Sequence, residues 1–319
     1  DATYRLDVPA GVPLGTYEVE TSLHDRASGA RLGAAGPDGD FVGTRVPVGT
    51  VAVQRPQTAP DVAELDPSLR LDASIGPLTL LGANPPAAEA ASGDRLSFSL
   101  YWQAETAPEA DYHLRIQWVD SEGQARLEKL EPMSAYPTSR WRAGDRFQTR
   151  HRVRVSAGLP AGRYELTLRL VDASSGSSVG DPIPLTAMEI RSRDRSFSLP
   201  DEDLQPMDLV FGEHIHLCGY RVAETDLVPG GMLPLTLCWR ADEEAGALDG
   251  DLSFFVHLLG PDGVVRGQVD RVPGGGAWPT SSWAPGQVVV DRIDLPVPPG
   301  APPGEYTMAV GFYDPRYGG

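Results

Sequence analysis

A short motif recurs three times along the chain and constrains the fold more than any other feature. It reads Pro-x-Gly-x-Tyr and ends at Tyr17, Tyr164 and Tyr306, with spacings of 147 and 142 residues. Each tyrosine begins an apolar stretch that ends eight residues later on an aspartate, at Asp25, Asp172 and Asp314. Repetition over such a long period indicates tandem copies of one structural unit.

Two further elements recur in the same order between these motifs. Alternating apolar residues over 96–102 end at Trp102, and the same pattern over 233–239 ends at Trp239. The loop at 137–141 (Pro-Thr-Ser-Arg-Trp) returns at 279–283 as Pro-Thr-Ser-Ser-Trp. Several shared elements in one order make a chance match between the copies very improbable.

The repeated unit has the pattern of a β-sandwich. Apolar and polar residues alternate with period two between turns rich in Gly, Pro and Asp, which is the signature of short antiparallel strands. The chain has 35 glycines and 30 prolines in 319 residues, and helix breakers at this frequency exclude a helical bundle. We therefore expect an all-β protein of tandem immunoglobulin-like antiparallel β-sandwiches, with Trp102 and Trp239 in the cores and the three motif tyrosines as corner residues.

The frame of the repeats divides the chain into five parts. They are a partial repeat at 1–53 with only its second half, a linker at 54–70, a complete repeat at 71–190, a linker at 191–208, and a repeat at 209–319 that lacks its last strand. Because the pattern starts and stops inside a repeat, we expect the sequence to be part of a longer polypeptide.

Charge and motif content narrow the function. The 27 basic and 44 acidic residues give a net charge of −17, which repels phosphate backbones and argues against nucleic acid as a partner. No apolar run approaches the length of a membrane span, and no nucleophile elbow, zinc-protease motif or phosphate-binding loop is present. We expect a non-enzyme; a β-scaffold glycoside hydrolase that uses two of the carboxylates is an alternative.

The third copy carries a more specific pattern, and copy two matches it less closely. Its elements are His216–Tyr220, Leu237–Arg240, Phe255–Leu258, Gln268, Asp270, Pro279–Trp283, Asp291 and Pro303–Tyr306. This pattern resembles the soluble C-terminal β-sandwich repeats attached to bacterial multi-spanning membrane glycosyltransferases of the mannosyltransferase-like type. The resemblance implies a non-catalytic, extracytoplasmic accessory or structural module linked to cell-surface glycan assembly. Its implied partners are a glycan, another protein domain, or a membrane-embedded region of the same parent chain or of a neighbour.

Aromatic residues in the repeated loop suggest a carbohydrate-binding module as the alternative function. Tyr136 and Trp278 precede the Pro-Thr-Ser element, and Trp141 and Trp283 close it. Aromatic rings can stack on sugar rings while amide and carboxylate groups bind hydroxyls, and Gln268 and Asp270 lie in the segment that leads into the loop. The other interpretation is that these aromatic residues only cover an end of the sandwich.

Histidines, cysteines and acidic turns offer weaker candidates. His214, His216 and Cys218 alternate along a predicted strand, and Cys238 lies on another. This leaves three states open for the cysteines: a disulfide, two free thiols, or ligands of a metal shared with the histidines. Aspartates at the ends of the repeats, Asp25, Asp172 and Asp314, fit turn residues, with structural calcium as the alternative. No other cofactor is expected.

Overall fold

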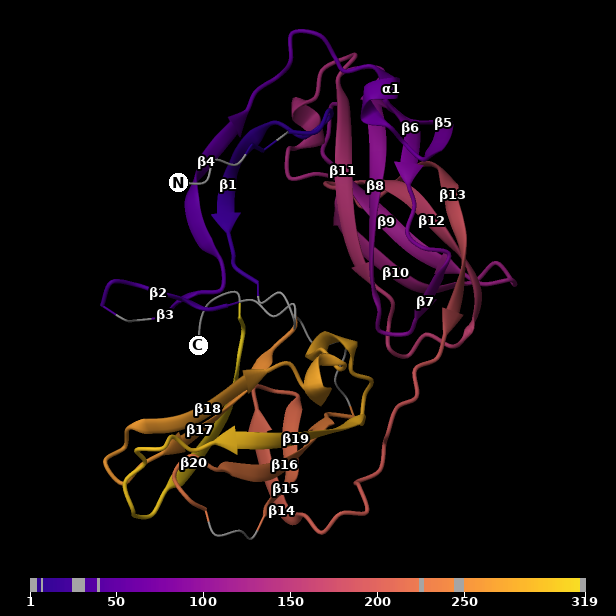
Figure 1. The fold of residues 1–319 in the computed structure, drawn as a ribbon. Helices are drawn as coiled ribbons and strands as arrows, with labels where there is room; N and C mark the ends of the chain where they lie inside the picture. The colour runs from indigo at the N-terminus through magenta and orange to yellow at the C-terminus, as the bar shows by residue number, and fades with distance from the viewer. Residues whose placement is uncertain are drawn as a thin grey trace. The chain divides into compact units, whose positions relative to one another are not determined.

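The computed structural model describes residues 5–6, 8–24, 32–38, 41–223, 227–243 and 250–315. The chain divides into two compact units, one formed by 1–20 with 47–192 and the other by 21–46 with 193–319. Each unit contains one β-sandwich, which we call the first sandwich (69–191) and the second sandwich (205–315) (Figure 1). The expectation of an all-β chain of tandem sandwiches is confirmed.

The first sandwich has one layer of five strands and one of four. The five-stranded layer runs β10 (Ala125–Pro132), β9 (Tyr112–Val119), β12 (Gly162–Asp172), β13 (Ser178–Arg191) and β7 (Glu89–Ala91). The four-stranded layer runs β11 (Arg146–Arg154), β8 (Arg95–Ala104), β6 (Leu78–Asn84) and β5 (Leu69–Ile75). Neighbouring strands are antiparallel except β13 and β7, which are parallel.

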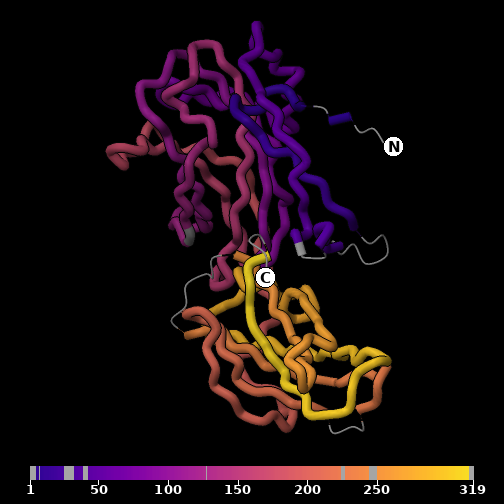
Figure 2. Tube along the Cα trace, turned by 90° about the vertical axis from the view of Figure 1, so that its left-hand side faces the viewer, coloured from indigo at the N-terminus to yellow at the C-terminus, as the bar shows by residue number. Residues whose placement is uncertain are grey.

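The second sandwich repeats this plan with a smaller layer. Its four-stranded layer runs β14 (Gln205–Phe211), β15 (Ile215–Val222), β16 (Met232–Ala241) and β19 (Val288–Pro296). Its three-stranded layer runs β18 (Val265–Arg271), β17 (Ser253–Leu259) and β20 (Thr307–Tyr313). The path of the chain through each sandwich can be followed in Figure 2.

Period-two alternation explains which residues fill each core. In β8, Leu96, Phe98, Leu100 and Trp102 point inward and are buried, because successive side chains of a strand face opposite sides. In β16 the same positions bury Leu233, Leu235, Leu237 and Trp239. The prediction that both tryptophans lie in the cores is confirmed, since neither exposes any surface.

The corner role of the motif tyrosines is also confirmed. The Tyr17 hydroxyl donates to the carbonyl oxygen of Pro13 at 2.7 Å. Tyr164 donates to the Pro160 carbonyl at 3.1 Å, and Tyr306 to the Pro302 carbonyl at 2.6 Å. In each case the acceptor lies four residues before the tyrosine, so the bond fixes the turn that leads into the strand.

The N-terminal part contains short elements besides the sandwiches. β1 (Gly15–Thr21) pairs with β4 (Val46–Val53), and β2 (Ala34–Ala35) pairs with β3 (Phe41–Gly43). The helix α1 (Val62–Leu65) begins at Asp61, whose side chain and that of Glu64 form a capping box. The described residues of 1–53 thus form two strand pairs, β1 with β4 and β2 with β3.

Two predicted boundaries shift in the structure. The predicted linker 54–70 contains α1 and the start of β5 at Leu69, and β14 begins at Gln205, inside the predicted linker 191–208. β5 and β14 are edge strands of their four-stranded layers, and each begins two to four residues before the predicted start of its repeat at 71 or 209. Among the described residues no helix is long and apolar enough to cross a membrane.

The last strand of the second sandwich differs from its counterpart in the first. β12 lies between β9 and β13, whereas β20 pairs with β17, and no other strand pairs with it within 5–315 as described. Beside it lies an open apolar cavity of about 570 Å³, lined by side chains of β14, β15, β16 and β20 that include Phe211, Leu237 and Met308. In the first sandwich β13 occupies the equivalent place next to β12.

Candidate functional site

The repeated Pro-Thr-Ser loop has the same local construction in both sandwiches. The Thr138 hydroxyl donates to the Ala110 carbonyl and accepts from the Tyr112 amide, at 3.1 and 2.8 Å. Thr280 makes the same pair of bonds to Gly250 and Leu252, at 3.0 and 2.9 Å. Each loop is a single turn of 3-10 helix, Thr138–Arg140 or Thr280–Ser282, and its threonine ties it to the start of a neighbouring strand.

The tryptophans that close these loops are core residues. Trp141 exposes 1% of its surface and Trp283 exposes 3%. Their indole N–H groups donate to the carbonyls of Tyr136 and Trp278, at 3.3 and 2.9 Å. Residues buried to this extent cannot present a ring to a ligand, so we leave both out of any binding surface.

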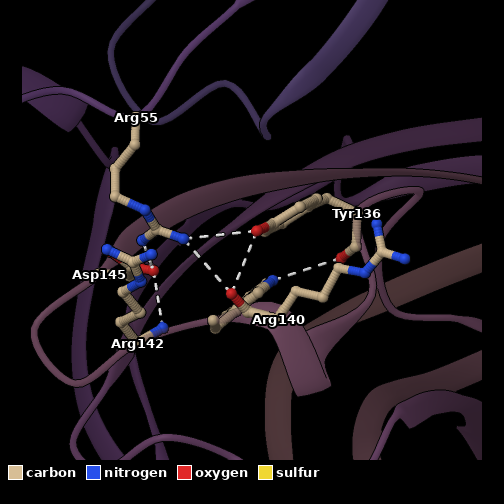
Figure 3. A network of polar contacts seen from close by, with 6 residues as sticks. Arg55, Tyr136, Arg140, Arg142 and Asp145 are labelled. Carbon is tan, nitrogen blue, oxygen red and sulfur yellow. Dashed lines mark hydrogen bonds and ion pairs between the residues drawn. The ribbon is translucent and has the colours of Figure 1, made fainter.

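Tyr136 is held by a polar network within the first unit (Figure 3). Its hydroxyl donates to the Arg140 carbonyl at 3.1 Å and accepts from Arg55 at 3.4 Å. Arg55 also forms an ion pair with Asp145, whose carboxylate accepts from the Arg142 amide at 2.7 Å. The Tyr136 ring packs edge-on against Phe147 with centroids 5.8 Å apart, so this side chain fastens the segment around Arg55 to the loop.

Trp278 is half-buried beneath two arginines. The guanidinium carbons of Arg193 and Arg195 lie 4.9 and 5.0 Å from the ring centroid, in the range of a cation–π interaction. The ring also lies against the turn at Gly274, where an added Cβ would come within 2.4 Å of it. Trp278 lines an open cavity of about 620 Å³ together with residues 194–198 and 288–290. Its ring is therefore partly occupied by contacts within the chain.

Gln268 and Asp270 lie on the outer face of the three-stranded layer. They alternate along β18 and are exposed. The antiparallel register places Gln268 opposite His257 of β17, and Asp270 opposite Phe255. Since directly opposed residues share one face of a sheet, these four side chains form a block on the solvent side.

Tyr313 of β20 completes this block, which we call the platform: Phe255, His257, Gln268, Asp270 and Tyr313. The Phe255 and His257 rings have centroids 4.5 Å apart, and the Phe255 and Tyr313 centroids are 6.5 Å apart. Gly311 lies opposite Phe255 on β20, and a Cβ there would come within 2.5 Å of the tip of the ring. The glycine therefore gives the Phe255 ring room to extend over β20.

The platform combines half-buried rings with exposed polar groups. Phe255, His257 and Tyr313 are half-buried, whereas the amide of Gln268 and the carboxylate of Asp270 belong to exposed side chains. Burial, and then the neighbouring Asp270 carboxylate, raise the pKa of the Tyr313 phenol. The phenol therefore keeps its proton and is a hydrogen-bond donor throughout the neutral pH range.

Among the side chains that the structure describes, the equivalent face of the first sandwich has no such aromatic block. Arg115 and Gln117 of β9 occupy the places of Phe255 and His257, with Glu128 of β10 opposite Gln117. Gln117 donates to Glu128 at 3.1 Å, and Arg115 lies 3.6 Å from the same carboxylate. This is a solvated, charge-paired surface.

A buried carboxylate supports the edge of the second sandwich. Asp291 of β19 accepts from the Trp239 indole at 3.1 Å and from the backbone amides of Gly274 and Gly275 at 2.9 and 3.2 Å. Arg271, at the end of β18, lies 3.5 Å from it. Asp291 thus fixes the turn that follows β18 and, with it, the strand that carries Gln268 and Asp270.

The histidine and cysteine candidates do not come together as a metal site. His214 lies in the turn before β15 rather than on the strand, and His216 contacts Asp208 at 3.3 Å. No group of three or more His, Cys, Asp or Glu side chains suited to a metal ion occurs in the described part of the chain. Cys218 and Cys238 are free thiols with their sulfur atoms 2.7 Å apart.

Where the structure describes them, the acidic candidates lie at the ends of strands. One oxygen of Asp172 accepts from the amides of Ser174 and Ser175, at 3.0 and 2.8 Å, and from both hydroxyls. The Ser174 hydroxyl bond is the largest of the effects that lower the pKa of Asp172 to about 2. Asp314 follows β20, and Asp25 lies outside the described residues. Asp172 is a turn residue whose oxygen is already occupied by hydrogen bonds.

Sequence reasoning missed three of the five platform residues as ligand contacts. Phe255, His257 and Tyr313 alternate on their strands with core residues, which was a usable signal for an outward direction. The register between β17, β18 and β20 was the missing information, because only the pairing shows that these positions are neighbours.

Comparisons with known proteins give distant structural likeness alone. No protein-family model matches the chain, and no curated protein matches its sequence. The crystal structure of the C-terminal domain of wzt is similar with 12% identity and a TM-score of 0.30, over 47% of this chain and 96% of that one. A Salmonella alpha-2-macroglobulin mutant (12%, TM-score 0.23) and the native E. coli alpha-2-macroglobulin (10%, TM-score 0.23) are similar over 96% and 91% of this chain. The chain spans only 20% and 17% of those two proteins, and we draw nothing about activity from likeness at these TM-scores.

Proposed function

We propose that this chain is a non-catalytic module that binds glycans weakly through the platform on the second sandwich. The observation that carries the proposal is the register of β17, β18 and β20, which groups an aromatic ring, an imidazole, an amide, a carboxylate and a phenol on one open sheet face. The proposed setting is extracytoplasmic, as an accessory to a membrane-embedded glycosyltransferase region.

The chemistry of the platform suits a sugar ring. The apolar C–H face of a pyranose packs on an aromatic ring, which excludes water without losing hydrogen bonds. Its hydroxyl groups both donate and accept, and Asp270 is an acceptor while the Gln268 amide is both. A flat exposed sheet face binds a chain of sugars along its surface rather than enclosing a single small molecule.

The platform as defined has one carboxylate, Asp270. Most glycoside hydrolases use two carboxyl groups held roughly 5–10 Å apart across the scissile bond. A binding function needs no such pair, so the geometry favours recognition over hydrolysis.

The test is a glycan-array screen followed by titration of the best oligosaccharide against the chain. Phe255→Ala removes the stacking ring, and we expect binding at least about tenfold weaker, which corresponds to about 1.4 kcal/mol. Arg115→Ala is the matched control, because Arg115 holds the place of Phe255 on the first sandwich. The control should bind as the unchanged chain does.

The Trp278→Ala variant tests whether the glycan binds at the platform or at the loop that carries Trp278 beneath Arg193 and Arg195. Retained binding in Trp278→Ala together with loss in Phe255→Ala supports the platform. Loss in Trp278→Ala with full binding in Phe255→Ala would move the site to the cavity beside Trp278. If no glycan binds the unchanged chain at millimolar concentration, the binding proposal is wrong and a spacer role is left.

A further inference from the structure

Cys218 and Cys238 lie side by side on adjacent strands of the second sandwich. The register of β15 and β16 shifts between Leu217 and Gly219, so Cys218 is the extra residue of a β-bulge opposite Cys238. The Cys218 thiol contacts both the sulfur and the carbonyl oxygen of Cys238, at 2.7 and 3.0 Å. A disulfide holds its sulfur atoms about 2.05 Å apart, so two sulfur atoms already in contact at 2.7 Å need only a small movement to bond.

The two sulfurs differ in their access to solvent. Cys238 is fully buried, whereas Cys218 is half-buried. The segment before β14 covers this face of the strands. A Cβ added at Gly219 would come within 3.2 Å of Leu204, which belongs to that segment. Glu202 of the same segment forms ion pairs with Arg221 and Arg292. An external reagent therefore reaches the sulfur of Cys218 first.

The first sandwich shows what the same position does without sulfur. It has the same bulge, with Leu81 as the extra residue and Tyr101 opposite. The Tyr101 hydroxyl accepts from Asn84 at 2.7 Å and from Gln148 at 3.2 Å, which ties strands β6, β8 and β11 together. In the first sandwich, therefore, a side chain on the outer face of the bulge connects neighbouring strands.

We propose that Cys218 and Cys238 form an intramolecular disulfide that takes the place of the Tyr101 connection. The oxidant is a disulfide of a thiol–disulfide exchange reagent or oxidoreductase. The Cys218 thiolate attacks one sulfur of that disulfide and expels the other as a thiolate, which gives a mixed disulfide on Cys218. Cys238 then loses its proton, attacks the Cys218 sulfur and expels the second thiolate.

The balance of this reaction is two thiols oxidised to one disulfide and one external disulfide reduced to two thiols, with two electrons transferred. The hydrogen bond between the two thiols lowers the pKa of Cys218, which supports Cys218 as the attacking sulfur. The product links β15 to β16 and so closes the outer face of the four-stranded layer at the bulge.

The test uses the full chain, which contains only these two cysteines. The chain is reduced, freed of reductant, and treated with oxidised glutathione; it is then denatured and alkylated with iodoacetamide, and its intact mass is measured. We expect a monomer lighter by two hydrogens than the reduced chain, without alkylation and without a glutathione adduct. Cys238→Ser should instead hold one glutathione on Cys218, because the resolving sulfur is gone.

A second measurement covers the case in which a variant folds poorly. Urea unfolding of the unchanged chain should shift to higher urea after oxidation, whereas the Cys218→Ser chain should show no shift. A lasting glutathione adduct on Cys218 of the unchanged chain, alkylation of both thiols, or a disulfide-linked dimer would overturn the proposal. None of these results bears on glycan binding at the platform, which lies on the other layer.

Discussion

The two sandwiches share one frame and differ in what they carry on it. Both place a tryptophan at the centre, a corner tyrosine at the connection between the layers that leads into β12 or β20, and a threonine-tied loop at one end. They differ in the polar group beneath the tryptophan: Thr149 in the first sandwich and Asp291 in the second. The shared fold thus depends on local features that recur in both sandwiches, and we expect function where the two sandwiches differ.

The polar groups beneath the tryptophans show how far the divergence reaches. In the first sandwich the Trp102 indole donates to Thr149, which contacts the buried His151 at 2.8 Å, and His151 lies 2.7 Å from Glu131. In the second, Asp291 accepts from Trp239 and from the turn after β18. The first network crosses between strands, whereas the second organises a loop and the strand that leads to the platform.

The largest effect should come from removing Asp291. Asp291→Ala leaves the Trp239 indole and two backbone amides without their acceptor and removes the ion-pair partner of Arg271, and breaking a buried ion pair in this way costs about 3 kcal/mol of the free energy of unfolding. Thr149→Ala removes a neutral hydrogen-bond partner and should cost about 1 kcal/mol. Urea unfolding followed by tryptophan fluorescence compares the two variants; equal costs would contradict the difference between the networks.

The corner tyrosines should behave alike, which tests the shared part of the comparison. Tyr164→Phe and Tyr306→Phe each remove one hydroxyl bond to a carbonyl four residues earlier, and each should cost about 1 kcal/mol of the free energy of unfolding. The measurement is the same urea titration. A cost in one sandwich alone would show that the corner has different roles in the two copies.

The smallest effect concerns acid stability of the first sandwich. The serine hydrogen bonds of the turn lower the pKa of Asp172 from 3.8 to about 2, so the folded state favours the ionised carboxylate. Asp172 therefore contributes stability above pH 3.8 that is lost as the pH falls toward 2. The Asp172→Asn chain should show a weaker fall in melting temperature between pH 4 and pH 2, roughly the range that separates the two pKa values. An identical fall in both chains would contradict the assignment.

The sequence was sufficient to predict whatever depends on neighbours along the chain. Alternation of apolar residues predicted the strands and the buried Trp102 and Trp239, and the Pro-x-Gly-x-Tyr motif predicted corner tyrosines whose hydroxyls bond nearby backbone. Contacts between segments that lie far apart in the sequence could not be predicted in this way. Trp278 was a candidate stacking residue, but Arg193 and Arg195, more than eighty residues earlier, lie against its ring.

The same reason explains why the platform was only partly predicted. Gln268 and Asp270 were identified from their place before the loop, while Phe255 and Tyr313 acquire their meaning from the register of three strands. Trp141 and Trp283 are aromatic residues in a loop, as a sugar-binding site would have. Their indole N–H groups nevertheless donate to carbonyls within that loop, and their rings fill the cores. Residue type alone does not separate a ring that covers a core from one that faces solvent.

The tyrosine corners have a consequence for how such a chain arises. Each tyrosine hydroxyl bonds a carbonyl only four residues earlier, so duplication of a stretch of gene copies the donor and its acceptor together. A new copy can therefore form this turn without adjusting to older copies. Mutations are then free to accumulate on the outer faces, and a single ancestral module can give rise to an array whose members bear unrelated surfaces.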